Sequence, residues 1–292
     1  MYKLLNLVIM NFLECRLIVD AGGTKTTWCE VGGDNRLLRV IKTSGINVSA
    51  MSADAVRAVI DGELMPLLGA GYTVGAVHYY GAGVVSETDR ELLAVVLGGL
   101  SARVEVSGDM LGAARAVLGS QPGIACILGT GSNTCLYDGT GLVDNVPGMG
   151  YILGDEGSGA SIGRRFVSDL FKREYPDEVR RAWDAEIGLD LAGVIERVYR
   201  RPRANSFLGS IVPLVRRLTS VPEVGAMVAD EFDRFFRRNV VKYGDHVTSL
   251  GLVGSVAQHF APEIGAAAAR YGYEITAIMS DPMEGLVRYH AL

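Results

Sequence analysis

The chain has 292 residues, about twice the usual size of a single domain, so two domains are expected. Hydrophobic residues make up 49% of it and charged residues 21%, which is typical of a globular protein with a large core. The formal net charge of -5, without a dominant basic patch, argues against a nucleic-acid-binding protein.

The N-terminal residues 1–12 contain a short apolar stretch over residues 4–10. This stretch is far shorter than the roughly 20 residues of a membrane span, and residues 1–12, with Lys3 as their only positive charge, do not resemble a signal peptide. It is either a strand extension or the product of an early start codon, with Met10 as the alternative start. The cysteines lack C-x-x-C spacing, which suits a reducing cytoplasm, and three of them lie in apolar runs typical of small buried side chains. They are Cys15, Cys29, Cys126 and Cys135.

The first predicted element is a buried strand over residues 17–19, which ends on Asp20. Gly22 and Gly23 follow as a turn, and Thr24 begins the next β-prone run. Glycine lets the backbone approach an anion closely, turn amides and hydroxyls donate to its oxygens, and a carboxylate can hold Mg²⁺ beside it. This segment therefore predicts a phosphate-binding hairpin with Asp20 next to a magnesium ion.

The remainder of the first half alternates strands and helices in the order β-β-β-α-β-α-β, ending near residue 120. Apolar residues at helical spacing predict the helix over residues 50–68. The expected strands lie at residues 17–19, 24–31, 37–42, 75–80 and 103–106, and the expected helices at residues 50–68, 87–97 and 110–118.

The same order then begins again, which predicts an internal duplication of one structural unit. We therefore expect one domain over residues 1–120 and a second, with a helical insertion, over residues 121–292. The expected strands of the second half lie at residues 123–128, 134–137, 141–146, 250–253 and 273–279. Its expected helices lie at residues 157–172, 176–199, 207–219, 222–243 and 282–289.

Each half has its own glycine-hydroxyl hairpin. In the second half the turn consists of Thr130, Gly131 and Ser132, after a buried strand. Neither hairpin has Walker A or G-x-G-x-x-G spacing, and a single Gly-Thr-Gly turn is most often a plain hairpin. Because the two turns occupy equivalent positions in the two halves, they predict a site in which a triphosphate is bound from both sides.

This arrangement resembles the actin-like ATPase and sugar kinase superfamily over about residues 17–290. Within it the chain is most similar to the BadF/BadG/BcrA/BcrD group and its N-acetylglucosamine kinase-like members, on the G-D-E-G-S segment at residues 154–158 and the D-P-M-E-G-L tail at residues 281–286. The resemblance implies an α/β fold of two ribonuclease H-like domains. Each would be a mixed β-sheet with flanking helices, with a cleft between the two domains.

The resemblance also implies roles for individual residues. Asp109 matches the catalytic aspartate that accepts the proton of a sugar hydroxyl, although it could equally cap the helix that follows it. Met149 departs from the tryptophan of human-type members, which leaves the sugar open. The implied sugar-binding residues are Asn47, Gly148, Met149, Gly150 and Asp155. The implied nucleotide-binding residues are Gly22, Gly23, Thr24, Lys25, Thr26, Thr130, Gly131, Ser132, Gly254 and Ser255, with Asp20 as the metal-binding residue.

By this resemblance the chain is expected to be a cytoplasmic, homodimeric kinase that uses ATP and Mg²⁺ to phosphorylate N-acetylglucosamine or N-acetylmuramic acid. One alternative is an ATPase activator of a 2-hydroxyacyl-CoA dehydratase, which holds a [4Fe-4S] cluster between two subunits; only Cys126 and Cys135 lie in the second half. The other alternative is a non-catalytic sugar sensor, but the first strand begins by residue 16 and leaves no place for an added DNA-binding module. The sequence leaves open the sugar, the hydroxyl that is phosphorylated and the oligomeric state.

Overall fold

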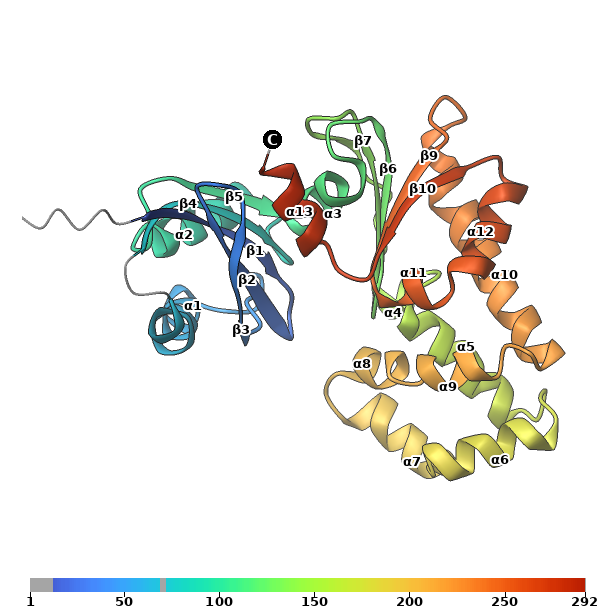
Figure 1. Ribbon diagram of the computed structural model, residues 1–292. Coiled ribbons are helices and arrows are strands. Elements are labelled where there is room, and N and C mark those ends of the chain that lie inside the picture. The colour runs from blue at the N-terminus through green and yellow to red at the C-terminus, as the bar shows by residue number, and fades with distance from the viewer. Residues whose placement is uncertain (1–12, 69–71, 292) are drawn as a thin grey trace, which may run out of the picture. The chain divides into compact units, whose positions relative to one another are not determined.

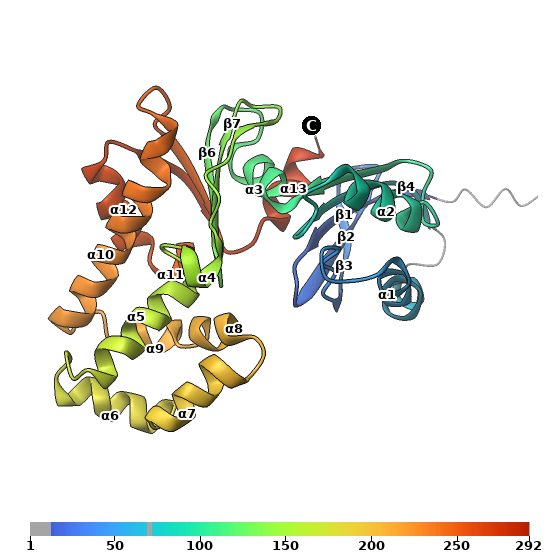
Figure 2. The same cartoon turned by 180° about the vertical axis from the view of Figure 1, so that it is seen from behind.

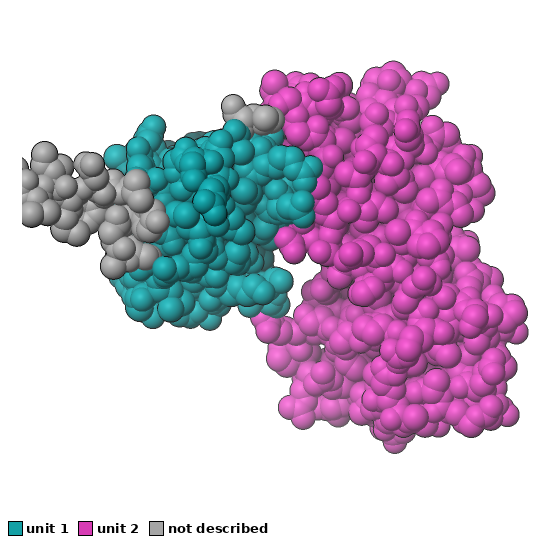
Figure 3. Space-filling model, in the orientation of Figure 1, with its two compact units in different colours: residues 1–112, 283–292 teal, residues 113–282 magenta. Residues whose placement is uncertain are grey.

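The computed structural model describes residues 13–68 and 72–291 (Figure 1), so the predictions for the N-terminal stretch and for Met10 lie outside the described residues. The chain groups into two compact units, Met1–Gly112 with Met283–Leu292, and Ala113–Pro282 (Figure 3). The second unit begins and ends earlier in the chain than the range 121–292 expected from the sequence. The division falls within a helix after Gly112, and the C-terminal helix belongs to the first unit.

The sheet of the first unit has the strand order β3-β2-β1-β4-β5. Its strands are β1 (Leu13–Ala21), β2 (Lys25–Gly32), β3 (Leu37–Ser44), β4 (Tyr72–Gly81) and β5 (Val104–Gly108). β1, β2 and β3 pair in antiparallel fashion, whereas β1, β4 and β5 run parallel. In this register Ala21 pairs with Gly81 and Gly81 with Gly108, so the carboxyl ends of the three parallel strands meet at one edge.

The sheet of the second unit has the order β10-β9-β6-β7-β8. Its strands are β6 (Gly123–Leu128), β7 (Ser132–Tyr137), β8 (Leu142–Asp144), β9 (Ser249–Val253) and β10 (Glu274–Met279). Counted from the first strand of each unit, both sheets have the order third-second-first-fourth-fifth, with the first two strands antiparallel. The predicted α/β fold of two mixed sheets with flanking helices, built by duplication, is confirmed.

The helices of the first unit are short and flank its sheet. They are α1 (Ala53–Val59), the π-helix η1 (Ile60–Leu64), the 3₁₀-helix η2 (Met65–Leu67), α2 (Glu87–Leu97), the first residues of α3 (Asp109–Leu118) and α13 (Met283–Tyr289). The predicted helix over residues 50–68 begins only after Ser52, whose side chain accepts a hydrogen bond from the backbone N–H of Ala55. Its last two turns change geometry because Gly62 and Pro66 weaken the regular α-helical pattern.

The C-terminal segment is held on the first sheet by polar contacts. The Nε2 atom of His290 lies 2.8 Å from the Tyr80 hydroxyl, and its carbonyl accepts a hydrogen bond of 2.5 Å from Arg16. The side chain of Asn35 donates to the carbonyl of Ala291 over 2.9 Å. These contacts explain why the last helix, which follows a strand of the second sheet, belongs to the first unit.

In the second unit, α10 and α12 lie on one face of the sheet, and a group of short helices lies beyond one end of it (Figures 1 and 2). The helices are α4 (Gly150–Leu153), α5 (Gly159–Phe171), α6 (Asp177–Glu186), α7 (Leu191–Ile195), the π-helix η3 (Glu196–Arg200), α8 (Ala204–Gly209), α9 (Val212–Arg217), α10 (Pro222–Arg238), the 3₁₀-helix η4 (Val240–Tyr243), α11 (Ser255–His259) and α12 (Ala261–Arg270). The prediction of one helix over residues 176–199 is wrong, because Gly188 adopts a φ of +65° and Asp190 caps a new helix. The sequence-based prediction also missed α4, α11 and α12.

None of the helices in the described part of the chain is long and apolar enough to span a membrane.

Candidate functional site

The first hairpin turn lies between β1 and β2, at the edge where the parallel strands end. The backbone N–H of Gly22 donates to the carbonyl of Lys25 over 2.9 Å and closes the turn. Gly23, Thr24 and Lys25 are exposed, and Asp20 is half-buried at the end of β1. The turn therefore presents amides, a hydroxyl and an ammonium group to solvent, beside one carboxylate.

Thr26 differs from these residues because its side chain is fully buried. Its hydroxyl accepts a hydrogen bond of 3.1 Å from the backbone N–H of Ile46. A Cβ on Gly45 would lie only 2.6 Å from backbone atoms of residues 22–24, so the loop after β3 packs directly against the turn. Thr26 thus supports the turn from the inside, and its hydroxyl is not at the surface.

Replacing Thr26 by valine is expected to lower the free energy of unfolding by about 1–3 kcal/mol, because the N–H of Ile46 would lose its acceptor in a buried place. Urea unfolding measures this, and hydrogen exchange should become faster at the amides of residues 45–47. Thr24→Val, at the exposed tip of the same hairpin, is the control and should leave stability unchanged. If the two variants unfolded at the same urea concentration, Thr26 would not support the turn.

The structure places Asn47 next to this turn. Its Oδ1 accepts hydrogen bonds from the backbone N–H of Ser49, at 3.1 Å, and from the Ser49 hydroxyl, at 2.7 Å. The amide Nδ2 lies 4.0 Å from the position that a Cβ on Gly23 would take. Within residues 13–68 and 72–291 the Nδ2 group donates to no other group, so it can serve a ligand.

Asp109 follows β5 directly and begins α3, so it lies at the same edge of the first sheet as the hairpin turn. Its Oδ1 accepts a hydrogen bond of 2.9 Å from the backbone N–H of Met110. Burial raises the pKa of the Asp109 carboxyl above its usual range, against the opposite effect of hydrogen bonds from its own backbone N–H and that of Met110. The two roles predicted for Asp109, helix cap and general base, are therefore compatible. Its side chain stabilises the start of α3, and its carboxylate has a raised basicity.

In the second unit, the turn after β6 is held on the first residues of α5. The backbone N–H of Gly159 donates to the carbonyl of Gly129 over 2.8 Å, and that of Ala160 donates to the carbonyl of Thr130 over 3.0 Å. The side chain of Thr130 is exposed. Ser132 is nearly buried and its hydroxyl donates to the carbonyl of Glu156 over 2.9 Å, so it joins the turn to the G-D-E-G-S segment.

Asp155 lies against the same turn. Its Oδ2 is 3.0 Å from the position that a Cβ on Gly131 would take, and its backbone N–H donates to the carbonyl of Gly148 over 2.6 Å. Burial raises the pKa of the Asp155 carboxyl, while hydrogen bonds from the backbone N–H groups of Ser132 and Gly150 lower it. The structure thus joins two predicted sugar-binding segments and the second hairpin within one unit.

The backbone is strained along this segment. Met149 and Asp155 have φ values of +68° and +56°, which residues with a side chain rarely adopt. Such conformations cost about 1–3 kcal/mol each and concentrate at functional sites, where the surrounding structure holds them in place. Met149 is 60% exposed, so its side chain is accessible to a ligand at this segment.

Glu231 of α10, which the sequence-based prediction missed, binds the end of the G-D-E-G-S segment and the first turn of α5. It is fully buried, and its Oε1 accepts hydrogen bonds from the backbone N–H of Gly157, at 2.9 Å, and from the Ser161 hydroxyl, at 2.6 Å. Its Oε2 pairs with Arg165 at 2.8 Å and with Arg234 at 3.3 Å. The sequence signal was present, because Glu231 occupies an apolar position of an amphipathic helix.

A cavity of about 130 Å³ in the second unit joins the predicted nucleotide-binding residues Thr130 and Ser255. Gly254, just before Ser255, has a φ of +126°, and a Cβ there would overlap the carbonyl of Leu128, so only glycine fits. Gly209, the last residue of α8, and Ser210, which follows it, also line this cavity, and nothing in their local sequence indicates it.

Cys126 and Cys135 lie on β6 and β7 and are both fully buried. Burial raises the pKa of the Cys126 thiol well above its usual value. Because metal clusters bind thiolates, and a cluster between subunits needs exposed ligands, these two cysteines do not fit such a site.

A scan of protein-family models and a search of curated proteins found no match to the chain. Among solved structures, one from Porphyromonas gingivalis, described as that of a proposed N-acetylglucosamine kinase, is 40% identical with a TM-score of 0.89 and covers 94% of this chain and 98% of its own.

Two further solved structures share the fold at lower identity. A proposed N-acetylglucosamine kinase from Chromobacterium violaceum is 22% identical, with a TM-score of 0.71 and coverage of 95% of this chain and 99% of its own. A glucokinase of the ROK family from Streptomyces griseus, in complex with glucose and AMPPNP, is 17% identical, with a TM-score of 0.56 and coverage of 94% and 97%.

The high identity to the first structure extends over nearly the full length of both chains, and the other two share the two-unit fold. The chain therefore belongs to the family of the Porphyromonas gingivalis protein, a sugar kinase family of the actin-like ATPase superfamily.

Proposed function

We propose that the chain transfers the γ-phosphoryl group of ATP to a hydroxyl of an N-acetylated amino sugar, N-acetylglucosamine or N-acetylmuramic acid. The observation that carries the proposal is Asp109, a carboxylate of raised basicity at the sheet edge that also carries a phosphate-type hairpin. The proposed N-acetylglucosamine kinase that is 40% identical to the chain supports the choice of sugar.

The carboxylate of Asp109 has the role of general base. A sugar hydroxyl is a weak nucleophile, and a carboxylate within hydrogen-bond reach accepts its proton as attack on the phosphorus develops. The raised pKa of Asp109 brings its basicity closer to neutral pH, where a general base is most effective. Asn47, with its Nδ2 donor available, and Asp155 would bind the sugar hydroxyls and the acetamido group.

ATP would be bound by backbone amides and hydroxyls of both hairpins. Thr24 and Lys25 are exposed on one turn and Thr130 on the other, and phosphoryl transfer requires mainly positioning and neutralisation of charge. The adenosine would occupy the cavity beside Ser255, where the bare Gly254 lets backbone pack closely. The bound AMPPNP of the Streptomyces griseus glucokinase supports this ligand.

The residues present also fit a magnesium ion. Mg²⁺ usually binds proteins through one or two carboxylates, keeping waters and phosphate oxygens as its other ligands, and Asp20 supplies one carboxylate beside the turn. When bound, the ion would neutralise charge on the phosphate oxygens. In the described residues no group of three or more His, Cys, Asp or Glu side chains could hold a metal by itself, which is compatible with an ion shared with the nucleotide.

Cytoplasmic location and a homodimer are further parts of the proposal. The cysteines are all buried and none forms a disulfide in the described residues, which suits a reducing compartment.

An assay that couples ADP formation to NADH oxidation tests the proposal with N-acetylglucosamine, N-acetylmuramic acid, glucosamine and glucose as acceptors. We expect turnover with at least one of the two N-acetylated sugars and a much lower kcat/KM with glucosamine and glucose. Sugar-independent ATP hydrolysis without a phosphorylated sugar, checked by mass spectrometry, would favour the ATPase-activator function. Binding of sugar without any turnover would favour a sensor.

Replacing Asp155 by asparagine is expected to lower kcat/KM for the sugar by about 10- to 100-fold, because a hydrogen bond to a charged group contributes about 1.5–3 kcal/mol. Asparagine tolerates the positive φ at this position, so the variant should fold normally. Steady-state kinetics should place the loss in the sugar KM, with the KM for ATP nearly unchanged. An equal rise in both KM values would contradict a specific sugar contact.

A further inference from the structure

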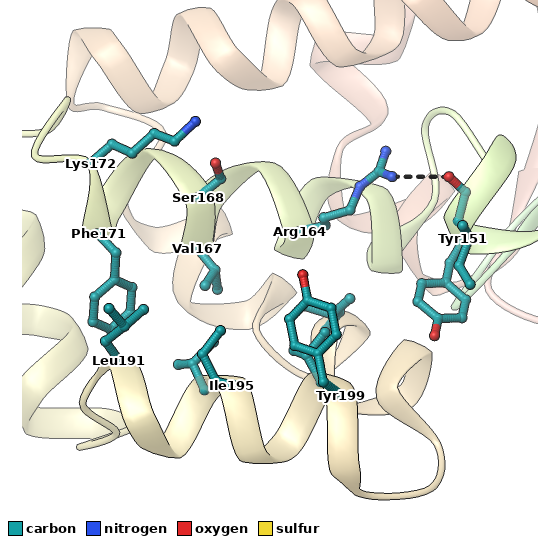
Figure 4. A pocket seen from close by; sticks show the side chains of 13 residues that line it. Tyr151, Arg164, Val167, Ser168, Phe171, Lys172, Leu191, Ile195 and Tyr199 are labelled. Carbon is teal, nitrogen blue, oxygen red and sulfur yellow. Dashed lines mark hydrogen bonds between the residues drawn. The ribbon is translucent and has the colours of Figure 1, made fainter.

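A groove of the second unit borders the predicted sugar-binding segment at Tyr151 and Ile152 of α4 and extends along α5. It has a volume of about 650 Å³ and lies between α5 and the segment formed by α7 and η3 (Figure 4). This volume is within the range of about 300–1,000 Å³ typical of small-molecule sites. We refer to it as the α5–α7 groove.

The floor and one side of the α5–α7 groove are apolar. Val167 and Phe171 of α5 face Leu191 and Ile195 of α7 across it, and Tyr199 of η3 lies at one end (Figure 4). Leu191 is 55% exposed, Ile195 41% and Tyr199 77%. Exposure of such large apolar side chains in a row is unfavourable in water, so the side of the groove formed by α7 and η3 is suited to an apolar ligand.

A row of cationic and polar side chains also lines the groove and extends from α5 away from α7 and η3 (Figure 4). Arg164 and Ser168 of α5 and Lys172, which directly follows the helix, are each four residues apart and therefore lie along one face of it. Arg164 donates a long hydrogen bond of 3.4 Å to the carbonyl of Ile152. Neither cation forms an ion pair with any residue in the described ranges, and no Asp or Glu lines the groove.

We propose that the α5–α7 groove binds a medium-chain carboxylate, with its head group at Arg164 and Ser168 and its alkyl chain along the apolar side. Arg164 and Lys172 are about 12 Å apart along the helix at 1.5 Å per residue, so one carboxylate contacts only one of them. The head group lies at Arg164, which is the less exposed of the two and has the Ser168 hydroxyl one turn away. Lys172 adds a weaker attraction from the far end.

The lining also argues against sugars and nucleotides in this place. A polyhydroxylated ligand would bury many donors and acceptors against aliphatic side chains, and each unsatisfied group would weaken binding. An alkyl chain has no such groups, and one carboxylate is satisfied by a guanidinium and a hydroxyl. The proposal is independent of the sugar kinase activity.

Isothermal titration calorimetry of the full chain with decanoate, below its critical micelle concentration, tests the proposal. We expect one saturable site per chain and at least about tenfold weaker binding of decan-1-ol, which lacks the charge. Arg164→Gln should weaken decanoate binding by about tenfold or more, and Lys172→Gln by less. Arg181→Gln removes an exposed cation of α6 outside the groove and should bind as the unmodified chain does.

A second variant tests the apolar side. Ile195→Asp places a charge at a half-exposed position of the groove, so it should fold normally, as checked by circular dichroism, and lose decanoate binding. Absence of saturable binding, equal affinity for decanoate and decan-1-ol, or unchanged binding by Arg164→Gln would overturn the proposal. Self-association of the chain through this groove would also overturn it. Analytical sedimentation would then show a dimer that dissociates in the Ile195→Asp variant but not on addition of decanoate.

Discussion

Replacing Asp109 by asparagine is expected to lower kcat for sugar phosphorylation by about 10²–10⁴-fold, the usual contribution of a positioned general base. Asparagine keeps the size of the side chain and can still accept the hydrogen bond from Met110, so the start of α3 should remain intact. It cannot accept the proton of the sugar hydroxyl. Initial rates measured by ADP formation, with both substrates saturating, give the change in kcat.

Two measurements separate a loss of catalysis from a loss of structure. Binding of ADP by calorimetry should be unchanged in Asp109→Asn, because the nucleotide contacts lie on the hairpins. Asp54→Asn, which neutralises a 95% exposed carboxylate at the start of α1, is the matched control and should keep normal turnover. Near-normal kcat in Asp109→Asn would show that another group, or water, accepts the proton.

The pH dependence has a definite sign. A general base acts only when deprotonated, so kcat/KM should fall as the pH decreases through the pKa of Asp109. Burial raises that pKa, so the acid limb should lie above the roughly 3.9 of an ordinary aspartate. The residual activity of Asp109→Asn should lack this limb, whereas that of Asp54→Asn should retain it.

The fold could be predicted from sequence because its signals are local. Short apolar runs that end in glycine turns define strands and hairpins without reference to distant residues, and the strand-helix order repeated in both halves. The resemblance to the actin-like ATPase superfamily, based on motifs such as residues 154–158, is confirmed by the solved structure that is 40% identical. The roles of the individual site residues remain predictions.

What could not be predicted depends on partners that are distant in the chain. The spacing of residues 24–27 did not indicate that Thr26 faces inward, because its partner Ile46 comes from the loop after the third strand. The helix predicted over residues 176–199 is broken at Gly188. The prediction missed this break because a helical pattern of apolar residues continues across the turn. Glu231 contacts a segment about 70 residues earlier, which no local pattern reveals.

That distant contact leads to the largest expected change in stability. Glu231→Ala is expected to lower the free energy of unfolding of the second unit by about 2–4 kcal/mol, because buried donors lose their acceptor and Arg165 keeps only the exposed Asp230 as its partner. Gly157 and Ser161 would also lose their acceptor, so the strained segment around Asp155 would be held less firmly. Urea unfolding followed by the fluorescence of Trp183, in a Trp28→Phe background, reports on the second unit alone, since the chain has two tryptophans.

The neighbouring residue Asp230 provides a matched control. Its carboxylate pairs with the same Arg165 at 2.7 Å, but its side chain is 54% exposed, whereas that of Glu231 is fully buried. Exposed ion pairs contribute about 0–1 kcal/mol, so Asp230→Ala in the same background should be nearly as stable as the unmodified unit. If the two variants unfold at the same urea concentration, the charge at Glu231 does not hold the G-D-E-G-S segment. The expected result is that only Glu231→Ala is destabilised and that only its KM for the sugar rises. Glu231 of α10 would then position the proposed sugar-binding segment through its hydrogen bonds to Gly157 and Ser161.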